Sequence, residues 1–438
     1  MKEEKKTVSE LDKVFGQLVK DHNTVAPGSA TTGDKMFAET KVWIPTGSSI
    51  LDIIISNNDK HGGWPAGRTV ELYGEEAIGK STLTFTGLAK TQKAGGVAIY
   101  YDVEQAGARN MMEACGIDMK RLIYSNNSSL EEIFETLEKN LKTIVDSGLF
   151  KGKPVLAVLD SLAQMMSDAE IEGTYDHNMN IALKKAMQLG KAIRKITPLL
   201  NKANACLIII NQLRDAPGIT YGDSCVTPGG KALKFAATVR IKLLGKTPVK
   251  IMDPNAERVY KGLITEWETA CKQWKDTGGS KVNGPKPKKP PKPKGDEIIV
   301  GYDVIARTDK NKVGPPKREA EFRIVFGKGI IQEYAWFDYA FKFGLIEDAG
   351  DFCFKVPSFP DIQPFRRVSW INILNGNTKF YKFIDETVKL KMVRSIDEYQ
   401  DVEEDSIEED ISGLEENELV DSSTGEIKTL VVVPETKE

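Results

Sequence analysis

The sequence predicts an α/β fold in which helices cover both faces of a twisted, mostly parallel sheet. Between about residues 41 and 244, strand-like runs alternate with helical ones, as parallel sheets require. The strand-like runs are short and continuously apolar, which is typical of strands buried on both faces. We expect strands at 69–73, 97–101, 122–124, 155–159 and 206–210, and helices at about 81–93, 130–145 and 180–201.

The third observation is a glycine-rich motif that joins the first of these strands to the first helix. Residues 74–81 read Gly-Glu-Glu-Ala-Ile-Gly-Lys-Ser, the G-x-x-x-x-G-K-[ST] phosphate loop. In such a loop the backbone N–H groups face phosphate oxygens, the lysine supplies a positive charge and the hydroxyl binds Mg²⁺. We therefore expect a nucleoside triphosphate and Mg²⁺ at Gly74, Glu75, Glu76, Ala77, Ile78, Gly79, Lys80, Ser81 and Thr82.

Length and composition place the chain among globular proteins with more than one structural unit. Its 438 residues exceed the usual limit of a single core, and 40% of them are hydrophobic and 28% charged. We find no apolar run long enough to span a membrane and no signal-peptide segment, and expect a cytoplasmic protein. The five cysteines are scattered without a C-x-x-C pair, so we expect reduced thiols and no zinc site.

Changes in composition divide the chain into four expected segments. These are an N-terminal amphipathic helix and linker at 1–40, an α/β core at 41–330, a small α+β lobe at 331–393 and an acidic, mostly disordered tail at 394–438. The helix carries apolar residues at helical spacing over 8–19. This stripe docks either on its own domain or on another subunit.

Two charged segments interrupt this layout. From about 247 to 297 the alternation breaks and ends in the Pro/Lys-rich run 286–294, which must be extended and solvated as an insertion or a basic surface loop. Residues 397–418 hold twelve Asp and Glu and no Lys or Arg, which leaves the rest of a chain of net charge −3 basic. Such a tail either competes with a polyanion for basic surface or only keeps the protein soluble.

Polar side chains follow three of the expected strands, at the edge where ligands of parallel sheets bind. Asp160 ends the strand 155–159, the position of a carboxylate that holds the Mg²⁺ shell opposite a phosphate loop. Glu104 follows 97–101 and is either an exposed turn residue or a base that orients the water attacking the γ-phosphate. Asn211 and Gln212 end the last strand, and an uncharged amide there can sense the γ-phosphate.

Two long loops next to these strand ends carry turn residues and polar side chains. The first, 213–231, includes Arg214, Tyr221 and Lys231. Its place after the amide predicts a binding loop whose order depends on ATP, and its backbone N–H groups and tyrosine suit single-stranded nucleic acid. The second such loop is 173–180.

Together these residues resemble a RecA-type DNA recombinase over about 43–343, apart from the insertion. Besides the phosphate loop, the matching stretches are 46–52, 169–173, 210–214 and 229–235. The resemblance implies a RecA-like, DNA-dependent ATPase that forms filaments on single-stranded DNA, pairs it with homologous double-stranded DNA and exchanges strands. The implied partners are both DNAs, further copies of the chain, and single-strand-binding and mediator proteins in a bacterial cytoplasm.

The same resemblance implies roles for individual residues in catalysis and DNA binding. Glu104 would activate the hydrolytic water and Gln212 would sense the γ-phosphate, with Lys80 on the phosphates and Asp160 on Mg²⁺. The implied DNA-binding residues are Gly173, Tyr175, His177, Asn178, Arg214, Tyr221, Gly229, Gly230 and Lys231.

The resemblance also implies contacts between subunits. Lys310 and Lys312 match lysines that reach the ATP of the neighbouring subunit. Without the resemblance they would be interpreted as solvated charges at a strand end. Phe235 matches a residue that relays between adjacent subunits, and the N-terminal helix matches one that packs on the next subunit.

Some positions depart from the family pattern. The aromatic residue that stacks on adenine falls near Met111 or Met112, and Ala108 stands where an acidic residue contacts the base. Adenine selectivity therefore does not follow from the resemblance. The Pro/Lys insertion and the basic C-terminal lobe are unlike the typical cellular member and point to a bacteriophage-encoded one.

The sequence leaves two other functions open. A ring-shaped helicase or translocase built on the same core would move along DNA instead of pairing it. A DNA-coating protein with a vestigial nucleotide site would bind without hydrolysis, although an intact set of Lys80, Ser81, Glu104 and Asp160 argues against it.

Overall fold

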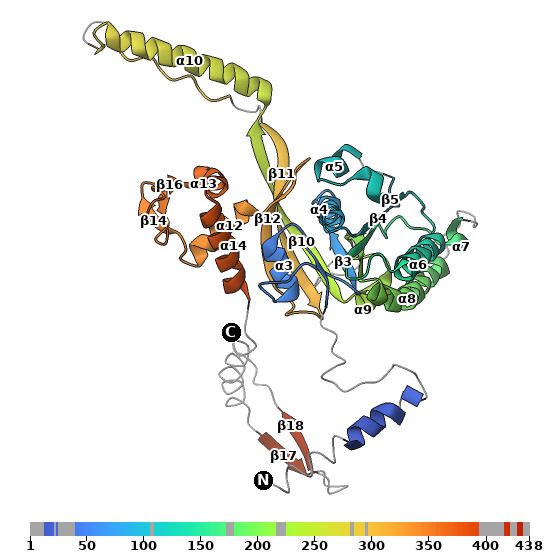
Figure 1. The fold of residues 1–438 in the computed structure, drawn as a ribbon. Coiled ribbons are helices and arrows are strands. Elements are labelled where there is room, and N and C mark those ends of the chain that lie inside the picture. Colours follow the sequence, from blue (N-terminus) through green and yellow to red (C-terminus); the bar gives the residue numbers. More distant parts are fainter. Residues whose placement is uncertain are drawn as a thin grey trace.

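The structure is a computed structural model of the chain (Figure 1). It describes residues 13–21, 23–24, 40–105, 109–171, 179–215, 225–280, 284–293, 297–393, 416–420 and 427–431. Within these ranges one large sheet with helices on both faces forms the body of the protein.

Nine strands form this sheet in the order β13–β12–β11–β10–β3–β7–β6–β4–β5. Six neighbours are parallel: β10 (Val239–Met252), β3 (Thr69–Gly74), β7 (Ala205–Gln212), β6 (Val155–Asp160), β4 (Val97–Asp102) and β5 (Leu122–Ser125). Three antiparallel strands extend it: β11 (Glu297–Asn311), β12 (Glu319–Val325) and β13 (Gly329–Ile331). The predicted α/β fold with a mostly parallel sheet is confirmed, as are the five strands expected between 69 and 210.

Each face of the sheet has its own hydrophobic core. In β6, Leu156 and Val158 belong to one core, whereas Val155, Ala157 and Leu159 belong to the other. The first core includes α3 (Ser49–Ser56), α4 (Lys80–Lys93) and α5 (Arg109–Ala114), and the second includes α6 (Leu130–Ser147), α8 (Met179–Lys202) and α9 (Gly230–Ala236). Burial on both faces explains why these strands are continuous apolar runs.

The C-terminal elements share the first core. They are α12 (Gln332–Lys342), β14 (Glu347–Gly350), β15 (Cys353–Lys355), β16 (Phe365–Arg366), α13 (Trp370–Gly376) and α14 (Thr378–Met392), and the three strands form a small antiparallel sheet. Trp336 is fully buried, meets Tyr381 edge-on at 5.0 Å and donates its indole N–H to Ser49 Oγ at 3.1 Å. This contact joins α12 to α3 in the body.

The region 247–297 differs from the sequence-based expectation. The pairing of β10 with β11 continues to Met252 opposite Glu297, and beyond it lies the 23-residue helix α10 (Pro254–Asp276), which projects from the body (Figure 1). The Asp253 carboxylate accepts hydrogen bonds from the N–H groups of Asn255 and Ala256, and proline occupies the first turn. These are the signals of a capped helix N-terminus. The alternation of strands and helices therefore breaks near 247 because a long strand is followed by a long helix there, and not because the chain lacks regular structure.

Shorter elements complete the description: β1 (Trp43–Ile44), β2 (Trp64–Pro65), η1 (Met119–Arg121), α7 (Asp168–Ile171), β8 (Arg214–Asp215), β9 (Cys225–Val226), η2 (Arg367–Ser369), β17 (Glu416–Val420) and β18 (Ile427–Val431). Strands β17 and β18 pair antiparallel within the expected tail 394–438. None of the helices in the described ranges has the length and apolar character that crossing a membrane requires.

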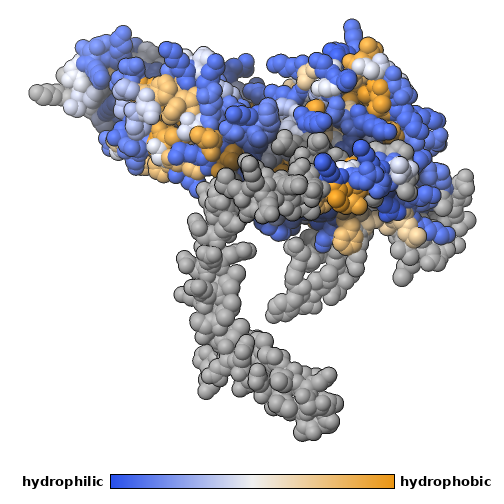
Figure 2. Space-filling model, turned by 60° about the horizontal axis from the view of Figure 1, so that its bottom comes forward, coloured by the Kyte–Doolittle hydropathy of each residue, from blue (hydrophilic) through white to orange (hydrophobic). Residues whose placement is uncertain are grey.

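Apolar side chains remain on the surface of the single chain. Figure 2 shows a face that is mostly hydrophilic, with hydrophobic residues in separate patches. In the N-terminal helix, described over 13–21, Val14, Phe15 and Leu18 are all more than half exposed. Most of the described part of the predicted amphipathic stripe is therefore exposed, with Val19 partly buried, and its first members, Val8 and Leu11, lie outside the described residues.

We predict that Trp336→Ala lowers the free energy of unfolding by about 3–5 kcal/mol, because it leaves a cavity where the C-terminal elements join the body. Phe352→Ala is the matched control, since this side chain is 89% exposed, and should change stability by about 0.5 kcal/mol or less. Chemical denaturation of both variants measures the difference. If both variants lost the same free energy of unfolding, the C-terminal elements and the body would not share a core.

Candidate active site

The phosphate loop lies between the fully buried strand β3 and the helix α4. Gly79 caps α4 with φ 98°, a conformation that L side chains rarely adopt. A Cβ atom at this position would lie 2.4 Å from Ile324 Cδ1 on β12. The loop therefore requires glycine here for its backbone conformation, whereas the tip of the Ile324 side chain could move aside for a Cβ atom.

Lys80 is buried at the start of α4 and folds back over the loop. Its Nζ donates hydrogen bonds to the carbonyls of Gly74 at 3.1 Å and Glu75 at 2.5 Å. Burial lowers the pKa of Lys80, and the nearby carboxylates of Asp160 and Glu104 offset part of this shift. A buried ammonium group whose hydrogen-bond partners in the described residues are carbonyls fits the phosphates of a nucleotide.

Asp160 ends β6 directly opposite this loop. Its Oδ2 accepts hydrogen bonds from Ser81 Oγ at 2.6 Å and from the hydroxyl of Tyr100 at 2.7 Å. Burial raises the pKa of this carboxyl, and the two hydrogen bonds counteract the rise only in part. A hydroxyl and a carboxylate are oxygen ligands that Mg²⁺ prefers, so the predicted pair fits a phosphate-bound Mg²⁺. Tyr100 was not predicted, since it lies inside an apolar strand.

Glu104 and Gln212, predicted separately, lie in contact. Gln212 Nε2 donates to Glu104 Oε1 at 2.9 Å, and Ser161 Oγ donates to the same oxygen at 2.5 Å. Their strands, β7 and β4, flank β6, so residues beyond the three strand ends converge above Asp160. Ser161 was missed by sequence reasoning, although it directly follows the predicted metal-binding residue.

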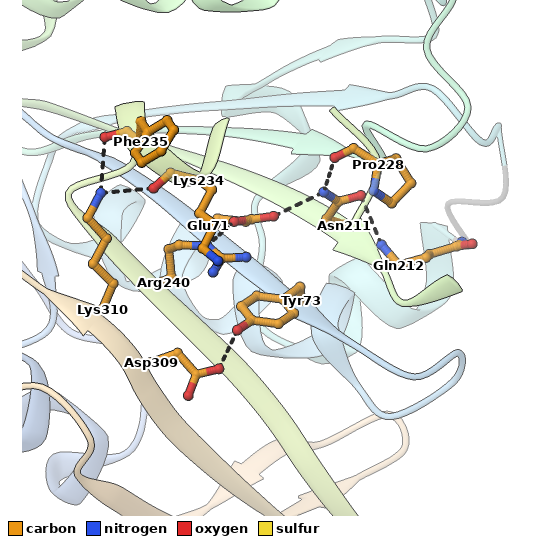
Figure 3. Close-up of polar contacts among 10 residues, drawn as sticks. All are labelled: Glu71, Tyr73, Asn211, Gln212, Pro228, Lys234, Phe235, Arg240, Asp309 and Lys310. Carbon is orange, nitrogen blue, oxygen red and sulfur yellow. Dashed lines mark hydrogen bonds and ion pairs between the residues drawn. The ribbon is translucent and has the colours of Figure 1, made fainter. Parts of the chain in front are cut away.

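Behind the nucleotide side lies a polar network that no sequence motif indicated (Figure 3). Glu71 in β3 has no exposed surface, and its carboxylate accepts from Arg240 Nε at 2.5 Å and from Asn211 Nδ2 at 3.0 Å. Asn211 Nδ2 also donates to the carbonyl of Pro228 at 2.9 Å, and its Oδ1 accepts from the backbone N–H of Gln212 at 3.1 Å. The end of β7 is thereby tied to the far end of the loop 213–231.

Lys310 lies on β11 opposite Arg240 and contacts α9 (Figure 3). Its Nζ donates to the last carbonyls of α9, those of Lys234 at 2.9 Å and Phe235 at 3.0 Å. Burial, together with the positive charges of Lys312 and Arg240, lowers the pKa of Lys310. The Phe235 side chain is 70% exposed, and Lys312 is exposed. The structure therefore brings Lys310, but not Lys312, onto the C-terminus of the helix that follows the DNA-loop candidate.

The predicted DNA-binding residues are described only in part. Gly173, Tyr175, His177, Asn178 and Tyr221 lie outside the described residues. Arg214 begins β8, which pairs with β9 and closes the base of the loop 213–231. Gly229 caps α9, and Gly230 and Lys231 open this helix.

The loop between β3 and α4, with the carboxylate opposite it, defines a phosphate-loop ATPase on a mostly parallel sheet. The family profile of the RecA N-terminal domain matches residues 5–261. The chain is 31% identical to Protein RecA of Thermotoga maritima over 350 residues, which cover 80% of this chain and 82% of that protein. It is 32% identical to Protein RecA of Bacteroides thetaiotaomicron over 318 residues, which cover 73% and 78%.

The chain therefore belongs to the RecA family. It is an ATP-dependent DNA recombinase and an ATPase of that family. The predicted resemblance is confirmed, whereas these bacterial relatives give no support to a bacteriophage origin.

We predict that Arg240→Met lowers the free energy of unfolding by about 3–5 kcal/mol, because it leaves the Glu71 carboxylate buried without its cation. The double change Glu71→Gln with Arg240→Met should restore most of this loss. Lys250→Met on the same strand is the matched control, since its 3.7 Å pair with Glu297 is half exposed and is worth about 1 kcal/mol or less. Urea denaturation that gave Arg240→Met and Lys250→Met the same loss would contradict this role of the pair.

Proposed function

We propose that the chain polymerises on single-stranded DNA with ATP between neighbouring subunits, and that the nucleotide controls the grip of the loop 213–231 on that DNA. One observation supports this coupling most directly: two consecutive residues at the end of β7 face the two sites. Gln212 donates to Glu104 on the nucleotide side, and Asn211 donates to the Pro228 carbonyl on the loop side. A displacement of one contact is therefore transmitted to the other through a single peptide unit.

For hydrolysis we assign roles that follow from the contacts. Lys80 binds the β- and γ-phosphates, and Ser81 and Asp160 hold Mg²⁺, the latter through water; the metal would neutralise charge on the phosphates. Glu104 accepts the proton of the attacking water. Because Ser161 and Gln212 both donate to Oε1 of Glu104, we assign this proton to Oε2.

The proposed switch starts at the Gln212 amide. In this structure the amide is bonded to Glu104, and a γ-phosphate offers a second, more highly charged acceptor. Rotation of the amide toward the phosphate would strain the adjoining contact of Asn211 with Pro228, which lies one residue before the cap of α9. The state that grips DNA is thereby favoured by ATP and released by hydrolysis.

For assembly we propose that Lys310 and Lys312 reach the ATP of the neighbouring subunit. In the single chain Lys310 bonds the last carbonyls of α9, so its transfer to a phosphate would free the end of that helix. The exposed Phe235 and the exposed stripe of Val14, Phe15 and Leu18 supply apolar surface for the next subunit. In a helical filament the next subunit would cover both Phe235 and this stripe.

The remaining predicted roles belong to the same proposal. The segment 1–40 would polymerise the protein, 41–330 would form the ATPase core, 331–393 a smaller lobe and 394–438 an acidic tail. Gly173, Tyr175, His177, Asn178, Arg214, Tyr221, Gly229, Gly230 and Lys231 would contact single-stranded DNA. Homologous duplex DNA, single-strand-binding proteins and mediators would be the other partners.

We predict that Glu104→Gln keeps nucleotide binding and filament formation but slows single-strand-stimulated ATP hydrolysis by about 10²–10⁴-fold, because the amide cannot accept the proton. Lys80→Ala should lose nucleotide binding itself. Glu135→Gln, an exposed carboxylate on α6, is the control that should hydrolyse at the normal rate. Normal hydrolysis by Glu104→Gln would exclude Glu104 as the base.

The experiment that tests the function is joint-molecule formation between a single strand and a homologous supercoiled duplex with ATP and Mg²⁺. We expect joint molecules to form only with the homologous duplex and to be absent with Lys80→Ala. Single-strand-stimulated hydrolysis without joints would favour a translocase, and absence of both would favour a coating protein. A heterologous duplex is the control.

A further inference from the structure

The projecting helix α10 and the segment 284–293 that returns beside it form an arm on the stem of β10 and β11 (Figure 1). The match to the RecA N-terminal domain ends at residue 261, so most of this arm lies beyond it. None of the roles proposed above for ATP or single-stranded DNA involves it. The arm is therefore a separate surface whose chemistry can be examined by itself.

The arm has a small core of its own. On α10, Tyr260, Ile264, Trp267, Cys271 and Trp274 recur at intervals of three or four residues, and each of them is partly or fully buried. In the returning segment, the half-buried residues are Pro287, Pro290 and Pro293. An interval of three is the repeat of a polyproline II helix, so one side of that helix packs toward α10.

Specific contacts hold the two pieces together. Trp267 donates its indole N–H to the carbonyl of Pro287 at 2.9 Å, and Trp274 donates to the carbonyl of Gly284 at 3.1 Å. The ammonium groups of Lys286 and Lys289 lie 5.8 and 5.7 Å from the centre of the Trp267 ring. The returning segment is therefore ordered before it meets any ligand, which reduces the entropic cost of binding.

The outer side of this segment carries only positive charge. Lys286, Lys288, Lys289 and Lys292 are exposed, and 284–293 contains no Asp or Glu. Within the described residues none of these four lysines forms an ion pair. Lys286, Lys289 and Lys292 follow the same interval of three, so they stand in a row with a repeat of about 9 Å. Such a row suits a repeating polyanion better than a single small anion.

We propose that this basic row binds the phosphate backbone of double-stranded DNA, outside the loops that would hold the single strand. Binding to unpaired bases relies on stacking aromatic side chains, and both tryptophans of the arm are engaged in its own core. Contacts to phosphate carry no sequence information, so the arm holds a duplex without selecting it. This inference rests on the proposed function only in taking duplex DNA as a substrate.

The test is the salt dependence of duplex binding by the full chain in which Lys286, Lys288, Lys289 and Lys292 are all changed to Gln. Each phosphate contact contributes about 0.9 to the slope of log K against log salt, so the slope should fall by about 3 to 4. The same four positions changed to Arg form the matched control and should keep the slope. Single-strand-stimulated ATP hydrolysis should stay normal in both variants.

A second variant protects the test against a misfolded arm. The double variant Lys288→Gln with Lys292→Gln leaves the two lysines on Trp267 in place. It should lower the slope of log K against log salt by about half as much as the fourfold Gln variant. An unchanged slope in the Gln variants would overturn the proposal and leave Val259 and Leu263, exposed on α10, as a contact for another protein. The proposal would also be overturned if the slope for single-stranded DNA fell as much as the slope for the duplex, or if the slope for the duplex fell in the Arg variant. A loss of single-strand-stimulated ATP hydrolysis in these variants would overturn it as well.

Discussion

A carboxylate without access to water lies in the middle of the sheet, and the strands that carry the site are organised around it. Glu71 bonds Arg240 from β10 on one side and Asn211 from β7 on the other. A buried charge of this kind is stable only with its partners in place. These two contacts therefore fix the three strands relative to one another, and two of them, β3 and β7, lead into the phosphate loop, the Gln212 amide and the DNA-loop candidate.

The candidate residues for both proposed functions lie at one edge of the sheet. The carboxyl ends of β3, β4, β6 and β7 lie side by side, as ligand-binding edges of parallel sheets do. Asp160 is bonded to Ser81 across this edge, and Glu104 to Gln212. In the proposed function the nucleotide and the loop 213–231 share the end of β7, so a short, direct path would join them without a long-range movement.

Much of this could be predicted from the sequence, because the evidence was local. The phosphate loop and Asp160 follow from spacing within a strand–loop–helix pattern, and burial on both faces gave the strands their apolar runs. The contacts of Glu71 with Arg240 and of Glu104 with Gln212 join residues more than a hundred positions apart, so no local pattern carries them.

The arm was missed for a different reason. The apolar interval on α10 was present in the sequence, but the Pro/Lys-rich run beside it was interpreted as a solvated loop. A proline helix buries one side in three only when a partner helix is available, and that partner lies next to it in the chain. The second predicted DNA-binding loop could not be compared in this way, because its residues 173–178 lie outside the described residues.

The central claim is that the nucleotide controls DNA binding through the end of β7. Its most direct test compares the affinity for single-stranded DNA with and without ATP in Asn211→Ala and in Asn201→Ala, an exposed amide on α8. We expect Asn211→Ala to bind ATP while losing most of the ATP-dependent gain in DNA affinity, a coupling of about 1–3 kcal/mol, and Asn201→Ala to keep it. A full gain in Asn211→Ala would contradict the account.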